Sequence, residues 1–182
     1  DRISSHLQHP PCTFQLKRFE PGTLTAIGFL DGVEAGNEAV RSLGIGAATT
    51  LVVAEIAANT LRPYHVGDSA MLVVGQRGRI KLQTVSHSPV GYALESGLLE
   101  EEEALHHDQR HLLSNMVGSA EMRIEVGSPI QLAPRDTVLL ATDGLLDNLS
   151  LQEIVDGIRT GPLARVVRHL AQTCGQRMRE PE

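Results

Sequence analysis

Short apolar runs separated by turn-forming residues fill the chain from Ala47 to Val85. The runs ATTLVVAEI, LRPYHV, AMLVV and RIKLQTV are divided by AANT, GDS and GQRG. Runs of this length, rich in Val, Ile, Leu and Thr and bounded by Gly, Asn and Asp, are typical of β-strands. We therefore predict an antiparallel meander in this part of the chain.

The spacing of apolar residues becomes helical between Ser86 and Gly118, where Gly91 and Gly97 interrupt it. This change predicts a small helical insertion, residues 86–118, in a chain that is otherwise rich in strands. Strands are expected to resume with MRIEVG, PIQLAP and DTVLLAT.

Two helices are predicted after the last of these strands. Ser150 and Glu153 form an S-x-x-E capping box, a signature of a helix start. The apolar face of this first helix is expected to contain Leu151, Ile154, Val155 and Ile158. Gly161 ends it, and Pro162 begins a second helix. The apolar face of the second helix is expected to contain Leu163, Val167, Leu170 and Cys174.

The composition favours one globular domain over residues 1–182. The chain has 182 residues, of which 41% are hydrophobic, enough for a sizeable core. The net charge of −6 argues against a nucleic-acid partner, because affinity for a phosphate backbone comes from clustered Lys and Arg. No apolar run is long enough to cross a membrane, so no membrane partner is expected. Two distant cysteines, Cys12 and Cys174, favour a cytoplasmic location.

Three carboxylates follow predicted strands and form the candidate chemical site. Asp143 ends the strand TVLLAT, Asp147 lies four residues later, and Asp68 follows the strand that contains Tyr64 and His65. Buried carboxylates are costly without a positive partner, and carboxylate oxygens suit Mg²⁺ or Mn²⁺. The alternative is that Asp68 and Asp143 are turn and capping residues, positions that Asp also favours.

The order of motifs resembles that of the metal-dependent Ser/Thr protein phosphatases of type 2C, the PPM family. HVGDSAMLVV and LLATDGLLDNLSLQEIV are similar to the family's GDS hairpin and metal-ligand strand, and GAATTLVVAEI is similar to the strand that precedes the hairpin. The segment 87–118 resembles the flap of the family. Together these motifs cover roughly residues 44–160 in consistent order.

The resemblance implies an α+β fold, a four-layer α/β/β/α sandwich of two mainly antiparallel sheets flanked by helices. It implies that Asp143 and Gly144 hold the catalytic metal and that Asp68 and Asp147 belong to the site and to an additional, weaker metal. It further implies Mg²⁺ or Mn²⁺ as cofactor, with two ions or three in a complete chain, and a phosphorylated protein as substrate. The chemistry implied is attack of a metal-activated water on a phosphate monoester.

Two motifs of the family do not match. The early D-G-x-G-G is represented by FLDGVEAGNEAV, in which Asp31 and Gly32 are candidate ligands but the Gly-Gly is absent. The segment EAGNEAVRSLGIGAATTL resembles instead the helix before the GATT strand. A final D-D/N-x-T is also absent. We therefore expect the domain to be incomplete at the early metal loop and at the C-terminus.

Other charged residues are weaker candidates. His107 and His111 have helical i, i+4 spacing and could hold a transition metal, although a solvated surface is the simpler interpretation. Arg110 and Arg135 are candidates for contacting a phosphate, with surface charge as the alternative.

Three functions are consistent with the sequence. The first is a phosphoprotein phosphatase. The second is a catalytically inactive pseudophosphatase that binds a phosphoprotein or a regulator, which the missing D-G-x-G-G would favour. The third is a β-sandwich binding module in which the carboxylates are structural.

Overall fold

The computed structural model describes residues 29–105, 107–159 and 161–179, and its strands form two antiparallel sheets. The first sheet contains β1 (Leu51–Ala57), β2 (Thr60–Val66), β5 (Glu125–Val126) and β6 (Ile130–Gln131). The second contains β3 (Ala70–Val74), β4 (Ile80–Gln83) and β7 (Thr137–Ala141) in the order β4-β3-β7. A short 3₁₀ turn, Gln76–Gly78, connects β3 to β4.

Strand β3 is the centre of the molecule, and all five of its residues are buried. Side chains alternate across a strand, so β3 contributes to two cores. Met71 and Val73 pack with Leu61 of the first sheet, which forms the core between the sheets. Leu72 and Val74 face the opposite way, onto the C-terminal helices.

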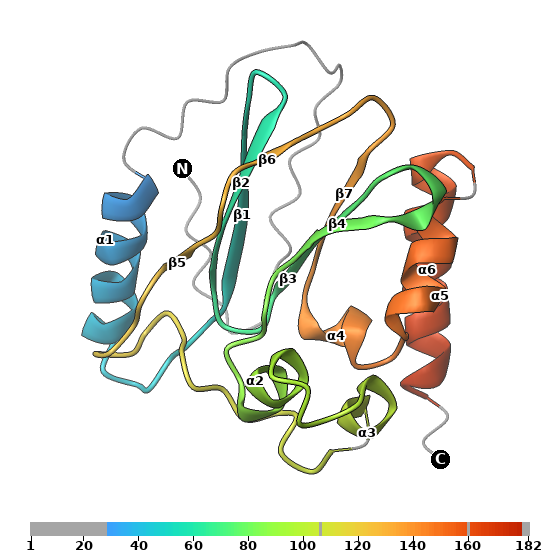
Figure 1. Ribbon diagram of the computed structural model, residues 1–182. Helices are drawn as coiled ribbons and strands as arrows, with labels where there is room; N and C mark the ends of the chain where they lie inside the picture. Colours follow the sequence, from blue (N-terminus) through green and yellow to red (C-terminus); the bar gives the residue numbers. More distant parts are fainter. Residues whose placement is uncertain (1–28, 106, 160, 180–182) are drawn as a thin grey trace.

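Helices cover the outer faces of the two sheets. Helices α5 (Leu151–Ile158) and α6 (Leu163–Arg177) pack on the second sheet, and α1 (Phe29–Ser42) lies on the far side of the molecule beside the first sheet (Figure 1). This is the α/β/β/α sandwich implied by the family resemblance, and the fold prediction is confirmed.

The predicted meander is divided between the two sheets. The expected strands and their antiparallel pairing are present, but β2 pairs with β1, β5 and β6 and not with β3. The reason is the Gly67–Ser69 turn, where Gly67 has φ +98°. That conformation suits glycine and directs the chain from one sheet into the other.

Helix α5 begins as predicted, with both hydrogen bonds of the Ser150–Glu153 capping box present. The face predicted for α6 is partly wrong. Leu170 and Cys174 are buried, but Leu163 and Val167 are 62% and 60% exposed, and Val166 is buried in their place. The packing of α6 against α5 and the sheet selects this register, which apolar spacing within α6 did not reveal.

Two short helices occupy the predicted insertion at residues 86–118. Helix α2 (Pro89–Glu95) begins at Ser88, whose side chain accepts a hydrogen bond from Gly91 N–H, and α3 (Glu101–Leu105) follows. Both lie near the short helix α4 (Asp143–Leu146) at one end of the sandwich (Figure 1). Among the described helices, none has the length and apolar character needed to cross a membrane.

The Glu153→Gln variant is expected to lose stability at neutral pH. Arg177 and the Ser150 backbone N–H hold the pKa of Glu153 at about 2, against an ordinary 4.5. The stability that the lowered pKa of Glu153 provides is fully present above pH 4.5 and is lost as the pH falls toward 2. Because Glu153 is partly exposed, we expect a loss of about 1 kcal/mol at pH 7. Urea unfolding should show the difference shrinking below pH 4.5; Asp156→Asn, on the same helix, is the control.

Candidate metal centre

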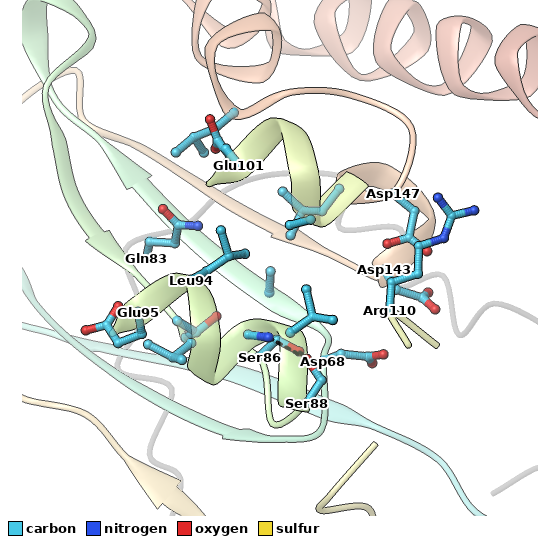
Figure 2. A pocket seen from close by; sticks show the side chains of 18 of the residues that line it. Asp68, Gln83, Ser86, Ser88, Leu94, Glu95, Glu101, Arg110, Asp143 and Asp147 are labelled. Atoms are coloured by element: carbon cyan, nitrogen blue, oxygen red, sulfur yellow. Dashed lines mark hydrogen bonds between the residues drawn. The ribbon is translucent and has the colours of Figure 1, made fainter. Parts of the chain in front are cut away.

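Asp68, Asp143 and Asp147 line one pocket of about 350 Å³ at the end of the sandwich where α2, α3 and α4 lie. The three carboxylates and Arg110 gather at one side of this pocket (Figure 2). Residues separated by 75 positions in the sequence, from Asp68 to Asp143, are thus brought together as the sequence predicted.

Two strand ends place these acids. Strand β7 ends at Ala141, and Asp143 is the first residue of α4. Asp147 ends that single helical turn, and its N–H donates to the Asp143 carbonyl over 2.8 Å. Asp68 follows β2 in the turn at Gly67. A Cβ added at Gly67 would overlap the Thr50 side chain. Glycine is therefore required next to Asp68 both by φ and by space.

The acids destabilise one another in the absence of a cation. Burial, and then the Asp143 and Asp147 carboxylates, raise the pKa of Asp68. Loss of hydration, and then Asp143, raise the pKa of Asp147, which Arg110 partly offsets. An acid whose folded-state pKa is raised costs stability at neutral pH. A divalent cation between these oxygens would remove that cost, so the donor set fits Mg²⁺ or Mn²⁺.

The structure gives less information on the other predicted ligands, Gly144, Asp31 and Gly32. Gly144 lies in the first turn of α4, and its carbonyl accepts a hydrogen bond from Asn148 Nδ2 at 2.9 Å. Asp31 and Gly32 lie in helix α1, which confirms that their segment forms the helix before β1, and the Asp31 side chain lies outside the described residues. The roles of Gly144, Asp31 and Gly32 as metal ligands stay predictions.

Arg110 belongs to the pocket, although the sequence favoured a surface role. It comes from the turn that follows α3, and its positive charge acts on Asp147. Arg135 lies instead in the turn between β6 and β7, with φ +72°, and does not line the pocket. The sequence carried no local signal for this difference, since only the folding back of residues 86–118 brings Arg110 to the acids.

The helical spacing of His107 and His111 is not used. Residues 108–111 form a turn, and the Gln109 N–H donates to His107 Nδ1 at 3.1 Å. The two imidazoles therefore do not lie one above the other on a helix face, which is the arrangement that an i, i+4 metal pair needs.

Replacing His107 and His111 together by Ala is expected to leave the stoichiometry of metal binding unchanged. Calorimetric titration with Mn²⁺ and with Zn²⁺, on the wild type and the double variant, measures this directly. Loss of a binding event in the variant would restore the histidine pair as a site.

An apolar wall extends the pocket away from the acids. Figure 2 shows Leu94, Glu95 and Glu101 on the side opposite Asp143 and Asp147. The apolar residues that line the pocket as a whole are Ala70, Val85, Val90, Leu94, Ala104, Leu146, Leu149 and Leu151. The pocket therefore offers an aspartate-rich end for a cation and, on the opposite side, apolar side chains with two glutamates beside them.

Known proteins share both the sequence and the fold. The chain is 30% identical over 129 residues to a Streptococcus pyogenes protein assigned to the protein phosphatases of 2C type, with 68% of this chain and 52% of that protein covered. It is 34% identical over 144 residues to protein phosphatase PhpP of Streptococcus pneumoniae, with 75% and 57% covered.

The structure of the Streptococcus agalactiae serine/threonine phosphatase superposes with a TM-score of 0.72 and 28% identity, covering 82% of this chain and 64% of that one. The chain belongs to the type 2C family of protein phosphatases. No family model matches it. The fold is also shared with the catalytic domain of PstP in complex with two manganese ions, at TM-score 0.69 and 24% identity, covering 87% of this chain and 67% of that one.

This type 2C chain spans about half the length of the two streptococcal relatives, 52% and 57%.

Proposed function

We propose that the chain is the core of a metal-dependent protein phosphatase that hydrolyses phospho-Ser or phospho-Thr. The observation that carries the proposal is the convergence of Asp68, Asp143 and Asp147 in one pocket of a type 2C fold. Two separate observations support metal-dependent hydrolysis of a phosphate ester. One is the similarity to protein phosphatases, and the other is the pocket in which carboxylates raise one another's pKa.

The carboxylates would hold Mg²⁺ or Mn²⁺, and a centre of two or three ions would need further ligands beside them; the PstP catalytic domain, for its part, was solved with two manganese ions. Such ions supply an activated water and neutralise phosphoryl oxygens. The crowding that raises the pKa of Asp68 and Asp147 prepares the site for a cation. Asp143 is the acid whose charge acts on both of the others.

Arg110 is suited to contact the phosphate. It lines the pocket beside Asp147, and a guanidinium offers planar, paired donors to phosphoryl oxygens. The peptide that carries the phosphate would extend along the apolar wall at Leu94. We place the protein in the cytoplasm, where a free buried thiol such as that of Cys174 persists.

The test is release of phosphate from a phosphothreonine peptide by the purified chain, with Mn²⁺ or with EDTA. We expect turnover that requires Mn²⁺. Peptide binding without Mn²⁺-dependent turnover would favour the pseudophosphatase. Absence of both Mn²⁺ binding and peptide binding would contradict the proposal in either form.

The apolar wall is expected to select the residue beside the phosphothreonine. Two phosphopeptides that differ only by Leu or Asp at that position should differ about tenfold in kcat/KM, in favour of Leu, because Glu95 and Glu101 repel acid and the wall excludes it. Leu94→Lys, which removes the apolar contact and offsets the charge of the two glutamates, should remove the preference. Hydrolysis of p-nitrophenyl phosphate, which has no such residue, is the control and should change little. Equal preference in wild type and variant would contradict this use of the wall.

A further inference from the structure

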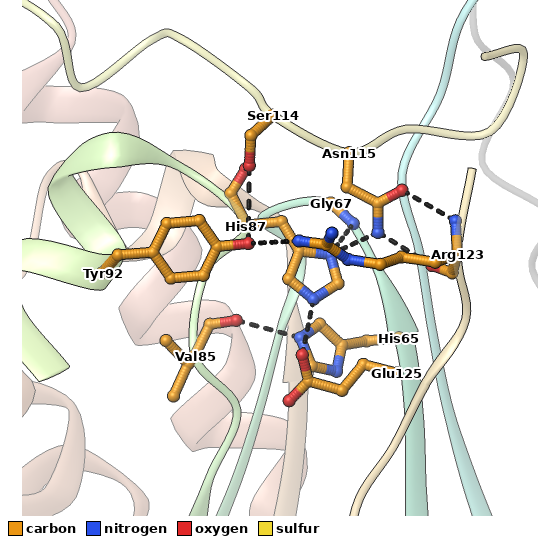
Figure 3. Close-up of polar contacts among 9 residues, drawn as sticks. All are labelled: His65, Gly67, Val85, His87, Tyr92, Ser114, Asn115, Arg123 and Glu125. Atoms are coloured by element: carbon orange, nitrogen blue, oxygen red, sulfur yellow. Dashed lines mark hydrogen bonds and ion pairs between the residues drawn. The ribbon is translucent and has the colours of Figure 1, made fainter. Parts of the chain in front are cut away.

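A second cluster of ionisable groups lies next to the Gly67–Ser69 turn and is not part of the pocket lining. His65 and His87 are buried, and their rings stack with centroids 4.3 Å apart. Glu125 completes the group, and one candidate ligand atom from each residue lies within 4.8 Å of the others. Among the described residues this is the group whose composition suggests a transition-metal site (Figure 3).

The hydrogen bonds assign the protons of His87 and argue against a metal there. Gly67 N–H donates to His87 Nδ1 at 3.0 Å. The Asn115 amide lies 2.8 Å from the same nitrogen, and its orientation is fixed because its Oδ1 accepts from Arg123 N–H while its Nδ2 donates to Arg123 O. Nδ1 therefore carries no proton, and Nε2–H donates to Glu125 over 2.9 Å.

A metal at Nε2 would have to displace that proton. The ring would then be left without a proton on either nitrogen, because Nδ1 already accepts from two donors. A neutral histidine ligand normally donates from its second nitrogen, which this environment does not allow. Both ring nitrogens of His87 are thus occupied by hydrogen bonds within the protein, and the role of His87 follows from the residues that these bonds fix in place.

What His87 holds is the turn that carries Asp68. The His87 backbone N–H donates to Gly67 O at 3.1 Å. The backbone N–H and the carbonyl of Gly67 are therefore both hydrogen-bonded to His87, one to the ring and one to the backbone. On the other side of the turn, the Thr50 and Ser69 hydroxyls are 2.7 Å apart. Asp68 lies between these two attachments and has its carboxylate in the pocket.

We propose that His87 is a positioning residue for the metal centre: through Nδ1 it fixes the Gly67–Ser69 turn that directs Asp68 into the pocket. The proposal rests on the proposed function, because Asp68 is taken as part of the metal centre. It also connects the centre to residues 86–118, since Ser114 N–H and Oγ–H both donate to His87 O, at 2.8 and 2.9 Å.

Two substitutions separate this role from simple packing. In His87→Asn the side-chain oxygen can occupy the position of Nδ1 and accept from Gly67 N–H. In His87→Gln the terminal amide reaches the position of Nε2 and the Nδ1 acceptor is lost. Both variants remove the stacked ring, so a packing role predicts similar behaviour for the two.

Amide hydrogen exchange at Gly67, followed by NMR, is the first measurement. We expect exchange in His87→Gln to be at least about tenfold faster than in His87→Asn, as for loss of a net hydrogen bond. Calorimetric titration with Mn²⁺ is the second, with affinity weaker by about 10- to 100-fold in His87→Gln, the usual effect of losing a partner behind a ligand. Glu125→Gln, which leaves Nδ1 untouched, is the control and should match the wild type in both.

Equal Gly67 exchange in the two His87 variants overturns the proposal. Should His87→Gln fail to fold by circular dichroism, Asn115→Asp replaces it without a change in size: the carboxylate draws a proton onto Nδ1, so Gly67 exchange should rise, and unchanged exchange overturns the proposal. Failure of the wild type to bind Mn²⁺ would instead contradict the proposed function, while the exchange difference would still decide the role of His87.

Discussion

Asp143→Asn is expected to abolish Mn²⁺-dependent phosphatase activity and to leave the fold intact. Asp143 lies beside both Asp68 and Asp147, so its charge is central to any cation in the pocket. Replacing a ligand carboxylate by an amide keeps the shape and removes the charge, and we expect a loss of at least about 100-fold in Mn²⁺ affinity and in rate.

The stability of the metal-free protein should change in the opposite direction. Asp143 raises the pKa of its two neighbours, which means that the three carboxylates repel one another at neutral pH. The Asp143→Asn variant should therefore unfold at an equal or higher urea concentration than the wild type when EDTA is present. A purely structural Asp143 predicts the reverse, a less stable variant with unchanged Mn²⁺ binding. Asp156→Asn, an exposed acid on α5, serves as the matched control.

The 182-residue chain is expected to hydrolyse p-nitrophenyl phosphate at least about 100-fold more slowly than a longer chain that carries a D-G-x-G-G loop and a final metal Asp. Three aspartates gather at one side of the pocket, and a centre of two or more cations needs further acids next to the ions to offset the repulsion between them. The second metal should be lost first. The sandwich should form in both, because both cores lie within residues 51–174.

The comparison requires both proteins in the same Mn²⁺ buffer, with circular dichroism to confirm folding. Calorimetry should show fewer Mn²⁺ ions bound to the 182-residue chain. Equal rates and equal stoichiometry would mean that the metal ligands are misplaced, and Asp31→Asn would then be the next variant, because Asp31 is the candidate acid whose side chain the structure does not place.

Local chemistry is what the sequence determined by itself. Alternating and continuous apolar runs located the strands, because side chains of a strand face its two sides in turn. Ser150 and Glu153 located the start of α5, because a capping box satisfies backbone N–H groups within four residues. Asp68 and Asp143 were recognisable as acids placed at strand ends, and their order along the chain indicated the family.

Only the tertiary structure decided which of these elements meet. The split between the two sheets depends on the Gly67 conformation and on the burial of both faces of β3, which no single run of residues encodes. Three further features depend on residues that are far apart in sequence. They are the buried face of α6, the position of Arg110 near Asp147 and the hydrogen bonds between His87 and Gly67. Periodicity and capping act over a few residues, whereas these contacts arise from the packing of whole elements, so they could be read only from the folded chain.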